Sequence, residues 1–187
     1  MSEKTTPKKY IIFMAHKGGV GKSTMSKQFS RELHRLGKVI EGQDYDPQQH
    51  FARFMEVNSY LFTKQEEAEY VVVDTQGAHT QTNIDIMQGM QHEDALFVVL
   101  FRPTEDDYKE ALVIRDRLKA QGVLDKALFV VNGCYRENDK DVKEFKERLR
   151  DTVKVAQSVF VQRKNYAKEP DSKVRGEISR FLHEAVL

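Results

Sequence analysis

Two lysines flank a run of glycines near the start of the chain, in the stretch MAHKGGVGKST at 14–24. An apolar run at 10–15 precedes the glycines, and a helical pattern that begins at Met25 follows them. A glycine-rich turn between a strand and a helix lets consecutive backbone N–H groups point at a phosphate. Lys22 can then reach the β- and γ-phosphates of a nucleotide, and the Ser23 hydroxyl can bind Mg²⁺. These residue types at this spacing predict a phosphate-binding loop.

A glycine-rich turn before a capped helix is the alternative explanation of this stretch. It accounts for the glycines, but it does not explain why Lys22 and Ser23 stand at the helix start, directly after an apolar strand. We therefore favour a P-loop that binds ATP and Mg²⁺. The residues expected to bind the nucleotide here are Gly18, Gly19, Val20, Gly21, Lys22, Ser23 and Thr24.

The loop departs from the ordinary pattern G-x-x-x-x-G-K-[ST], because His16 stands where the first glycine should be. KGGVGKST instead resembles the deviant Walker A box of the ParA/MinD family of ATPases, whose extra lysine stands where Lys17 does. In that family the extra lysine crosses a dimer interface and contacts the phosphates bound by the other subunit. The resemblance therefore implies an ATP-bound homodimer in which Lys17 and Lys22 are catalytic. A solvated loop lysine is the alternative for Lys17.

A second motif, QDYDPQQ at 43–49, follows the next apolar run. Two carboxylates after a buried strand can orient water or bind Mg²⁺ near a phosphate-binding loop. The motif resembles the family's second box, D-x-D-P-Q. The resemblance implies that Asp44 is catalytic and positions the attacking water, while Asp46 belongs to the metal site and to the switch that senses the γ-phosphate. A plain Asp-Pro turn is the alternative.

A third motif, YVVVDTQG at 70–77, is a hydrophobic strand that ends in a carboxylate, Asp74, which can hold a magnesium-bound water. It resembles the family's Walker B element. After the aspartate the family commonly has Thr-Pro-Pro, whereas this chain has Thr75, Gln76 and Gly77. Gly77 can still supply a backbone N–H to the γ-phosphate. Gln76 could orient water, although the family places no amide there.

Two C-terminal motifs concern the nucleotide base. Asn132 follows the apolar run at 127–131, where an amide can pair with N6 and N7 of adenine, and the family has an adenine-binding asparagine at this point. A turn asparagine in an Asn-Gly pair is the alternative. The loop VQRKNYAKEP at 161–170 resembles that of small plasmid-partition ATPases of the ParF kind, in which it borders the nucleotide and the dimer interface. The resemblance runs from about Tyr10 to the C-terminus.

These motifs can form one site only in a fold that brings the strand ends together. Short continuous apolar runs alternate with amphipathic stretches, which predicts buried parallel strands connected by helices. The strands are expected at 10–15, 38–43, 70–74, 95–101, 127–131 and 158–162. Helices are expected from Met25 to Gly37, at 104–120, at 139–155 and from Val174 to Ala185. The predicted fold class is α/β, a single-domain three-layer P-loop NTPase fold with a mostly parallel sheet and helices on both faces.

Composition limits the class of protein. The 187 residues carry a formal net charge of +1 and are 40% hydrophobic, which is typical of one soluble globular domain. The single cysteine, Cys134, excludes an internal disulfide and a multi-cysteine metal site within one chain, and it favours a reducing cytoplasm. We expect a flexible tail at 1–8 and a P-loop ATPase domain at 9–187. The apolar run at 10–15 is too short for a signal peptide or a membrane span.

The C-terminal part of the chain is basic. Residues 141–187 hold eleven Lys and Arg against eight Asp and Glu, in a chain that is otherwise slightly acidic. ParA-type relatives bind nonspecific DNA through such residues, and two subunits would double the footprint. The candidate DNA contacts are Arg148, Arg150, Lys154, Arg163, Lys164, Lys168, Lys173 and Arg175. A solvated mixed-charge helix is the alternative for 143–150, where glutamates alternate with the basic residues.

The resemblance also implies partners. The P-loop begins within the first twenty residues, with no helix-turn-helix before it, so a centromere-binding or other adaptor protein would select the cargo. MinD-type relatives bind membranes through a C-terminal amphipathic helix. Here the polar face of the last helix mixes Glu177 and Glu184 with Arg180, whereas a membrane-binding face should be basic. We therefore expect this helix to pack in the core.

The favoured function is a ParA-type switch ATPase that partitions plasmid or chromosomal DNA through slow ATP hydrolysis and nonspecific DNA binding. A related ATPase that positions other cargo, such as conjugation machinery, a protein cluster or a membrane-bound partner, has the same chemistry and stays open. An ATPase like the nitrogenase iron protein needs bridging cysteines that Cys134 alone cannot supply. A small-molecule P-loop kinase needs a lid and an acceptor pocket, for which the segment between Asp46 and Asp74 leaves little room. The six histidines are scattered singly and suggest no metal site.

Overall fold

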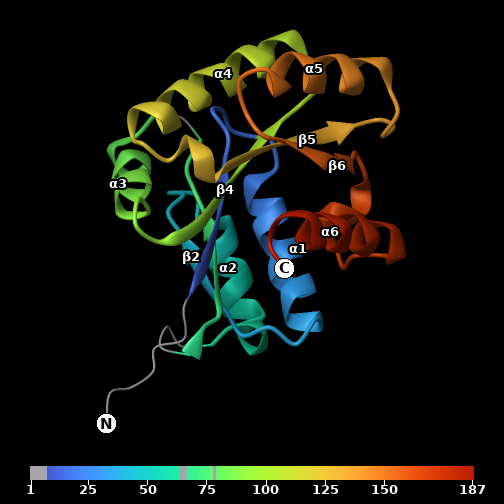
Figure 1. Cartoon of the computed structure of the whole chain (residues 1–187). Helices are drawn as coiled ribbons and strands as arrows, with labels where there is room; N and C mark the ends of the chain where they lie inside the picture. The colour runs from blue at the N-terminus through green and yellow to red at the C-terminus, as the bar shows by residue number, and fades with distance from the viewer. Residues whose placement is uncertain (1–7, 64–66, 78) are drawn as a thin grey trace.

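Parallel strands form one sheet in the computed structural model, which describes residues 8–63, 67–77 and 79–187 (Figure 1). Residues 1–7 of the predicted tail lie outside this part of the chain. The strands are β1 (Lys9–Met14), β2 (Ile40–Asp44), β3 (Tyr70–Asp74), β4 (Asp94–Phe101), β5 (Ala127–Cys134) and β6 (Val155–Val161). Their order in the sheet is β2-β3-β1-β4-β5-β6, and every pairing is parallel. The predicted parallel sheet is confirmed.

Helices cover both faces of the sheet. They are α1 (Lys22–Arg35), α2 (His50–Val57), α3 (Gln81–Gly89), α4 (Glu105–Ala120), α5 (Lys140–Arg150) and α6 (Ser172–Ala185). Short 3-10 helices lie in the connections: η1 (Ser59–Leu61), η3 (Leu124–Lys126) and η4 (Lys164–Ala167). One apolar core joins the sheet to α1, α2 and α6, and a second core joins it to α3, α4 and α5 (Figure 1). Because successive strand residues point to opposite faces, β1, β3, β4, β5 and β6 each contribute to both cores, whereas β2 contributes Ile40 to the first core. The predicted three-layer α/β fold is confirmed.

The last helix packs its apolar stripe into the first core, as the sequence predicts. Val174, Phe181 and Leu182 of α6 are fully buried, and Ile178 is 1% exposed. This face is therefore occupied by the protein itself. In the part of the chain that the structure describes, no helix combines the length and the apolar character needed to cross a membrane.

Several predicted boundaries are wrong, and the strand expected at 158–162 begins earlier, at Val155. The helix expected at 139–155 ends at Arg150, because the chain turns there and the β-branched Val153 and Val155 lead into β6. The strand expected at 127–131 continues to Cys134, with irregular pairing to β6 near its end. Asn132 therefore lies within β5 and not after it.

The apolar pattern of the sequence predicts neither α2 nor α3. Both are short, and each buries a single apolar side chain, Phe51 in α2 and Met87 in α3. One buried residue produces no helical apolar periodicity, so nothing in the pattern distinguishes these helices from loops.

The central position of β1 in the sheet determines where the candidate site lies. It lies between β3 and β4, and the chain winds in opposite directions from it. In open α/β sheets, ligands bind at such a switch point, outside the carboxyl ends of the strands. The register places Phe13 opposite Asp74, and Asp74 opposite Asp44. The loop after β1 therefore lies beside the ends of β2 and β3, which carry the other two predicted phosphate-site motifs.

One aromatic side chain joins the helix of the P-loop to the sheet. Phe29 of α1 is fully buried. Its ring lies 4.8 Å from Phe13 of β1, 6.1 Å from Phe160 of β6 and 5.4 Å from Phe181 of α6, as centroid separations. Edge-to-face aromatic pairs at such distances stabilise a core beyond the area that they bury. The start of α1 is thereby held against both the central strand and an edge strand.

We predict that Phe29→Ala lowers the free energy of unfolding by about 3–5 kcal/mol, since it removes a fully buried ring and leaves a cavity. Urea denaturation followed by circular dichroism measures this loss. Val57→Ala is the control, because Val57 is 82% exposed and its truncation should change the free energy by less than about 0.5 kcal/mol. A loss no larger than the control's would contradict the packing assigned to Phe29.

Candidate functional site

The loop between β1 and α1 has a conformation that only glycine adopts freely. Gly19 and Gly21 have φ angles of +76° and +101°, in the left-handed region. Gly21 directly precedes Lys22, the first residue of α1. The first N–H groups of a helix have no partner within the helix, so they are available to an anion bound in the loop.

A cavity of about 310 Å³ lies over this loop. It is lined by Gly18, Gly19, Gly21, Lys22, Ser23, Thr24, Lys27, Asp46, Gln48 and His50. The structure thus brings the glycine loop and the motif after β2 to one cavity. The sequence analysis did not single out Lys27 or His50. The spacing of four residues between Ser23 and Lys27 is a helical signal that could have found the lysine.

Lys22 is buried in this cavity, with 5% of the residue exposed. Burial lowers the pKa of Lys22, while the nearby carboxylates of Asp74 and Asp46 act in the opposite direction. A buried ammonium group is costly unless an anion compensates it. A phosphate bound in the loop would supply that negative charge.

Asp74 is fully buried at the end of β3, and among the described residues neither of its carboxylate oxygens has a hydrogen-bond partner of ordinary geometry, although the Ser23 hydroxyl lies nearby. Burial raises the pKa of Asp74 to about 6, although the Ser23 hydroxyl and Lys22 favour its ionised form. A buried carboxylate without such a partner fits a bound cation or a cation-bound water. Ser23 and Asp74 therefore suit the Mg²⁺ that the fold implies. Within the described ranges, no group of three His, Cys, Asp or Glu could hold a metal alone, so a nucleotide would have to supply further ligands.

The two aspartates after β2 have different surroundings. Asp44 Oδ1 accepts the N–H of Asp46 at 2.8 Å, and its Oδ2 accepts the N–H groups of Phe51 and Ala52 at 3.0 and 2.8 Å. Asp44 therefore fixes the turn and the start of α2. Asp46 lines the 310 Å³ cavity over the P-loop, which we call the phosphate cavity. The role of Asp44 in positioning the attacking water and that of Asp46 in the metal site stay predictions.

Lys17 bonds to its own chain. Its Nζ lies 2.6 Å from Asp107 Oδ1 in the first turn of α4, and this hydrogen bond raises the pKa of Lys17. His16 also contacts α4, through Glu110 on one ring nitrogen and Arg117 on the other. The role across a dimer interface that the resemblance implies for Lys17 stays a prediction. Asp107 and Glu110 are separated by one helical turn in the predicted helix at 104–120, but no sequence pattern linked them to the loop.

The loop after β3 touches the backbone of the P-loop. A Cβ atom added to Gly77 would lie 2.8 Å from the carbonyl carbon of Lys17 and 3.0 Å from the nitrogen of Gly18. Only glycine permits this approach. The carbonyl oxygen of Gln76 accepts a hydrogen bond of 3.0 Å from the side chain of Asn83, which ties the loop to α3. The suggested role of the Gln76 amide in orienting water stays a prediction.

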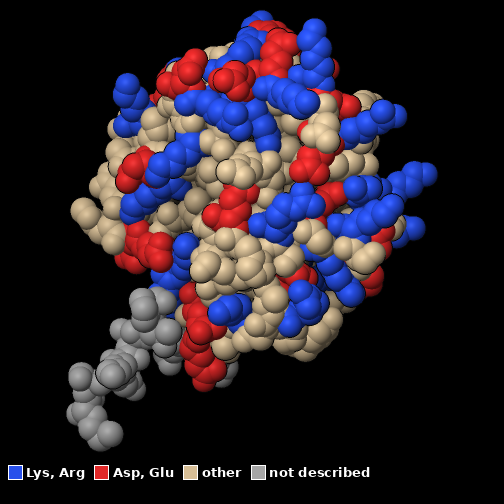
Figure 2. Space-filling model, turned by 45° about the vertical axis from the view of Figure 1, so that its right-hand side comes forward, with Lys and Arg blue, Asp and Glu red and all other residues tan. Residues whose placement is uncertain are grey.

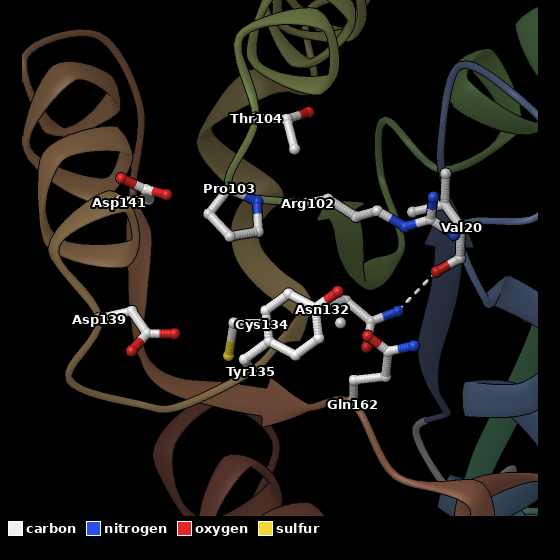
Figure 3. Close-up of a pocket in the computed structure, with 11 residues that line it drawn as sticks. Val20, Arg102, Pro103, Thr104, Asn132, Cys134, Tyr135, Asp139, Asp141 and Gln162 are labelled. Carbon is white, nitrogen blue, oxygen red and sulfur yellow. Dashed lines mark hydrogen bonds between the residues drawn. The ribbon is translucent and has the colours of Figure 1, made fainter.

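A second cavity, of about 470 Å³, lies at the carboxyl ends of β4 and β5 (Figure 3). Asn132 lines it, and its Nδ2 donates a hydrogen bond of 2.5 Å to the carbonyl oxygen of Val20. Arg102 Nη2 donates in the same way to the carbonyl oxygen of Gly19, at 2.7 Å. Both side chains therefore hold the P-loop. The predicted contact between Asn132 and adenine stays a prediction.

Two rings and a second amide also line this cavity. Figure 3 shows Pro103, Tyr135 and Gln162 at the same hollow as Asn132. Tyr135 is 81% exposed, so its ring is free to cover a flat ligand. A nucleoside base has the shape and the polar edge for such a site. Burial raises the pKa of the adjacent Cys134 to about 11, which keeps the thiol protonated and unreactive.

We predict that Gly77→Ala weakens nucleotide binding by about tenfold or more, because its Cβ would displace the P-loop backbone from its ligand. Titration with a fluorescent ATP analogue measures the change. Gly89→Ala is the control, since a Cβ there meets no atom within 4 Å. Equal affinities for the two variants would contradict the assigned contact.

We predict that Asp74→Asn stabilises the nucleotide-free protein by about 1–3 kcal/mol at neutral pH, while it removes the effect of Mg²⁺ on nucleotide binding. The raised pKa means that the ionised carboxylate opposes folding above about pH 6, and that this cost disappears below the ordinary value of 3.8. Urea denaturation at both ends of this range, with nucleotide titrations with and without Mg²⁺, tests both effects. Asp94→Asn, at an exposed strand end, is the control. A destabilised Asp74→Asn would disprove the assigned cost of burial.

Comparison with known proteins identifies a family and several solved structures with a similar fold. Residues 11–175 match the family described as the CobQ/CobB/MinD/ParA nucleotide binding domain. A search of curated proteins found no match. The structure resembles the MinD cell division protein of Aquifex aeolicus, at 15% identity and a TM-score of 0.68 over 96% of this chain and 98% of that one.

Two further structures are similar. A plasmid partition protein of Borrelia burgdorferi bound to AMPPNP is 13% identical, with a TM-score of 0.70 over 95% of this chain and 97% of that one. A variant of McdA from Cyanothece, in complex with ATP, is 10% identical, with a TM-score of 0.71 over 96% of each chain. At these identities the structural likeness establishes the fold. The family match, which covers most of the chain, adds the nucleotide-binding domain itself, and the chain therefore belongs to the CobQ/CobB/MinD/ParA nucleotide-binding family.

Proposed function

We propose that this protein is a ParA-type ATPase that binds ATP with Mg²⁺, dimerises when ATP is bound and hydrolyses ATP slowly. The observation that carries the proposal is the cavity that the glycine loop and the buried Lys22 line, together with Asp74, a fully buried carboxylate next to Ser23 and Lys22. An ATP–Mg²⁺ complex carries the negative phosphates that suit Lys22 and the cation that suits Asp74.

Most of the site residues have a proposed role at this cavity, and Asn132 has one at the neighbouring cavity. The loop backbone from Gly18 to Gly21 and the ammonium of Lys22 hold the β- and γ-phosphates, and Thr24 contacts the α-phosphate. Ser23, Asp46 and Asp74 hold Mg²⁺, which when bound neutralises charge on the phosphates. The remaining groups belong to hydrolysis. Asp44 positions the attacking water, Gly77 donates its N–H to the γ-phosphate, and Asn132 borders the adenine.

The structural neighbours support the proposed ligand and partners. The plasmid partition protein is bound to AMPPNP, the McdA variant is in complex with ATP, and MinD of Aquifex aeolicus also occurs in a complex with MinC. By analogy, we propose an adenine nucleotide as the ligand, a homodimer as the ATP-bound state and an adaptor protein as a partner. Lys17 would act across the interface of that dimer.

We also propose that the protein binds nonspecific duplex DNA. Four of the eight predicted contacts are used within the chain, and one of them is Arg150, which pairs with Glu147 at 3.3 Å. Arg148 pairs with Glu105 at 2.7 Å, Arg163 with Glu177 at 2.6 Å, and Lys154 donates to a backbone carbonyl at 2.7 Å. The structure therefore divides the predicted basic residues into occupied and available ones.

Four of the eight are exposed and make no side-chain hydrogen bond or ion pair within the described residues. They are Lys164, Lys168, Lys173 and Arg175. All four lie in or beside η4 and in the first turn of α6. On the face drawn in Figure 2, Lys and Arg side chains gather along the right-hand edge. Phosphate contacts by available cations such as these four would give sequence-independent, salt-dependent affinity. The protein would then be cytoplasmic and associated with the nucleoid.

We predict that the protein binds random-sequence duplex DNA tightly with AMPPNP and Mg²⁺, and weakly with ADP or without nucleotide. The affinity should fall steeply between about 50 and 200 mM salt, because each phosphate contact releases counterions. Fluorescence anisotropy measures binding, and light scattering on the same samples measures the mass. Lys173→Glu combined with Arg175→Glu should weaken binding by about tenfold or more without changing the AMPPNP-dependent mass.

Lys154→Glu is the matched control, since it makes one charge reversal at a lysine already bonded to a backbone carbonyl. If the mass depended on the nucleotide but the protein bound no DNA, the proposed ATP switch would stand. The cargo would then be something other than DNA, such as a protein scaffold or a membrane-bound partner. The same mass with ADP and with AMPPNP would disprove the switch.

A further inference from the structure

One face of α4 holds the two residues that begin the P-loop. Asp107 contacts Lys17, while Glu110 and Arg117 contact the two ring nitrogens of His16. These contacts join segments that are far apart in the sequence. None of the three α4 residues belongs to a motif that the proposed function uses.

The two partners in the Lys17–Asp107 pair differ in their freedom to move. Asp107 is 4% exposed, lies in the first turn of α4 and is within 3.3 Å of the Thr104 hydroxyl. The positive end of the helix dipole also favours its charge there. The Lys17 side chain is 44% exposed. The carboxylate is therefore fixed, and the lysine is the partner that can move away.

We propose that Asp107 is a positioning residue that holds Lys17 against its own chain, and that this ion pair must open before Lys17 can reach a nucleotide on a second subunit. The proposal rests on the proposed function, in which Lys17 acts across the dimer interface. An ammonium group 2.6 Å from Asp107 is directed at α4, so assembly exchanges the carboxylate for phosphate oxygens.

This exchange would make assembly depend on the charge of the nucleotide. A triphosphate offers more negative charge to the ammonium than a diphosphate does, so it competes better with Asp107. The pair of Lys17 and Asp107 would then set the ATP concentration at which dimers form. The second tether, from His16 to Glu110 and Arg117, keeps the start of the loop in place when Lys17 leaves.

Asp107→Asn tests this proposal, because it removes the charge and keeps the shape of the side chain. We expect the AMPPNP concentration for half-maximal dimerisation to fall about two- to fivefold, as for the loss of a partly exposed ion pair. The affinity of the monomer for AMPPNP, measured at protein concentrations below dimerisation, should not change. Light scattering and a fluorescent analogue provide the two readouts.

Asp106→Asn is the matched control, since it removes the same charge from the neighbouring exposed position of the same helical turn. Asp107→Glu restores the carboxylate and should restore the wild-type concentration dependence. An unchanged or higher AMPPNP requirement for Asp107→Asn, or an equal fall for Asp106→Asn, would overturn the proposal.

A measurement on the unmutated chain does not depend on the folding of a variant. With lysines labelled by ¹³C-methylation and Lys17 assigned through Lys17→Arg, the Lys17 resonance should titrate at higher pH than the exposed lysines, because Asp107 raises its pKa. AMPPNP should shift this resonance and ADP should not. A resonance that titrates with the other lysines would disprove the ion pair. A correct titration in a chain that stays monomeric with AMPPNP would instead disprove the proposed function and leave the contact intact.

Discussion

The parallel pairing of β1 with β3 on one side and β4 on the other is the constraint on which the site depends. It places the P-loop at the point where the winding of the chain reverses, and it aligns Phe13 with Asp74 and Asp74 with Asp44. Three segments that are separate in sequence therefore end at one edge of the sheet. Phe29 then holds the first helix over that edge through its contact with Phe13. The chemistry of the site is thus built on packing of the central strand.

Long-range contacts determine which way the P-loop backbone faces. Asn132 and Arg102 bond the carbonyl oxygens of Val20 and Gly19, so these carbonyls are turned toward the ends of β4 and β5. N–H groups, which a phosphate needs, are left for the other side of the loop. The close approach of Gly77 limits the loop from the β3 side. The loop is therefore organised before a ligand arrives, which reduces the cost of binding.

Burial of charged groups at the P-loop is costly to the protein, and this is why a ligand would matter to it. Burial disfavours the charged form of both Lys22 and Asp74, and no hydrogen bond of ordinary geometry within the described residues satisfies the carboxylate of Asp74. An anion with its own divalent cation would compensate both groups together. Lys17, by contrast, already has a compensating carboxylate in Asp107. The two lysines of the glycine loop thus differ in their surroundings: Lys22 is buried and makes no ion pair within the described residues, whereas Lys17 has one that a nucleotide would have to replace.

The sequence by itself determined the parallel α/β fold and the family, because the glycine loop, its lysines and the apolar strands are contiguous patterns with a local physical meaning. It also indicated which residues lie together at the P-loop, since Lys22, Ser23 and Asp74 each stand at a strand end or helix start. Only the tertiary structure decided that Asp46, and not Asp44, lines the phosphate cavity, and that Lys17 bonds Asp107. Those outcomes depend on the direction of a side chain after a strand end and on the register between distant elements. Neither the side-chain direction nor the register produces a periodic pattern in the sequence, so neither could be predicted from it.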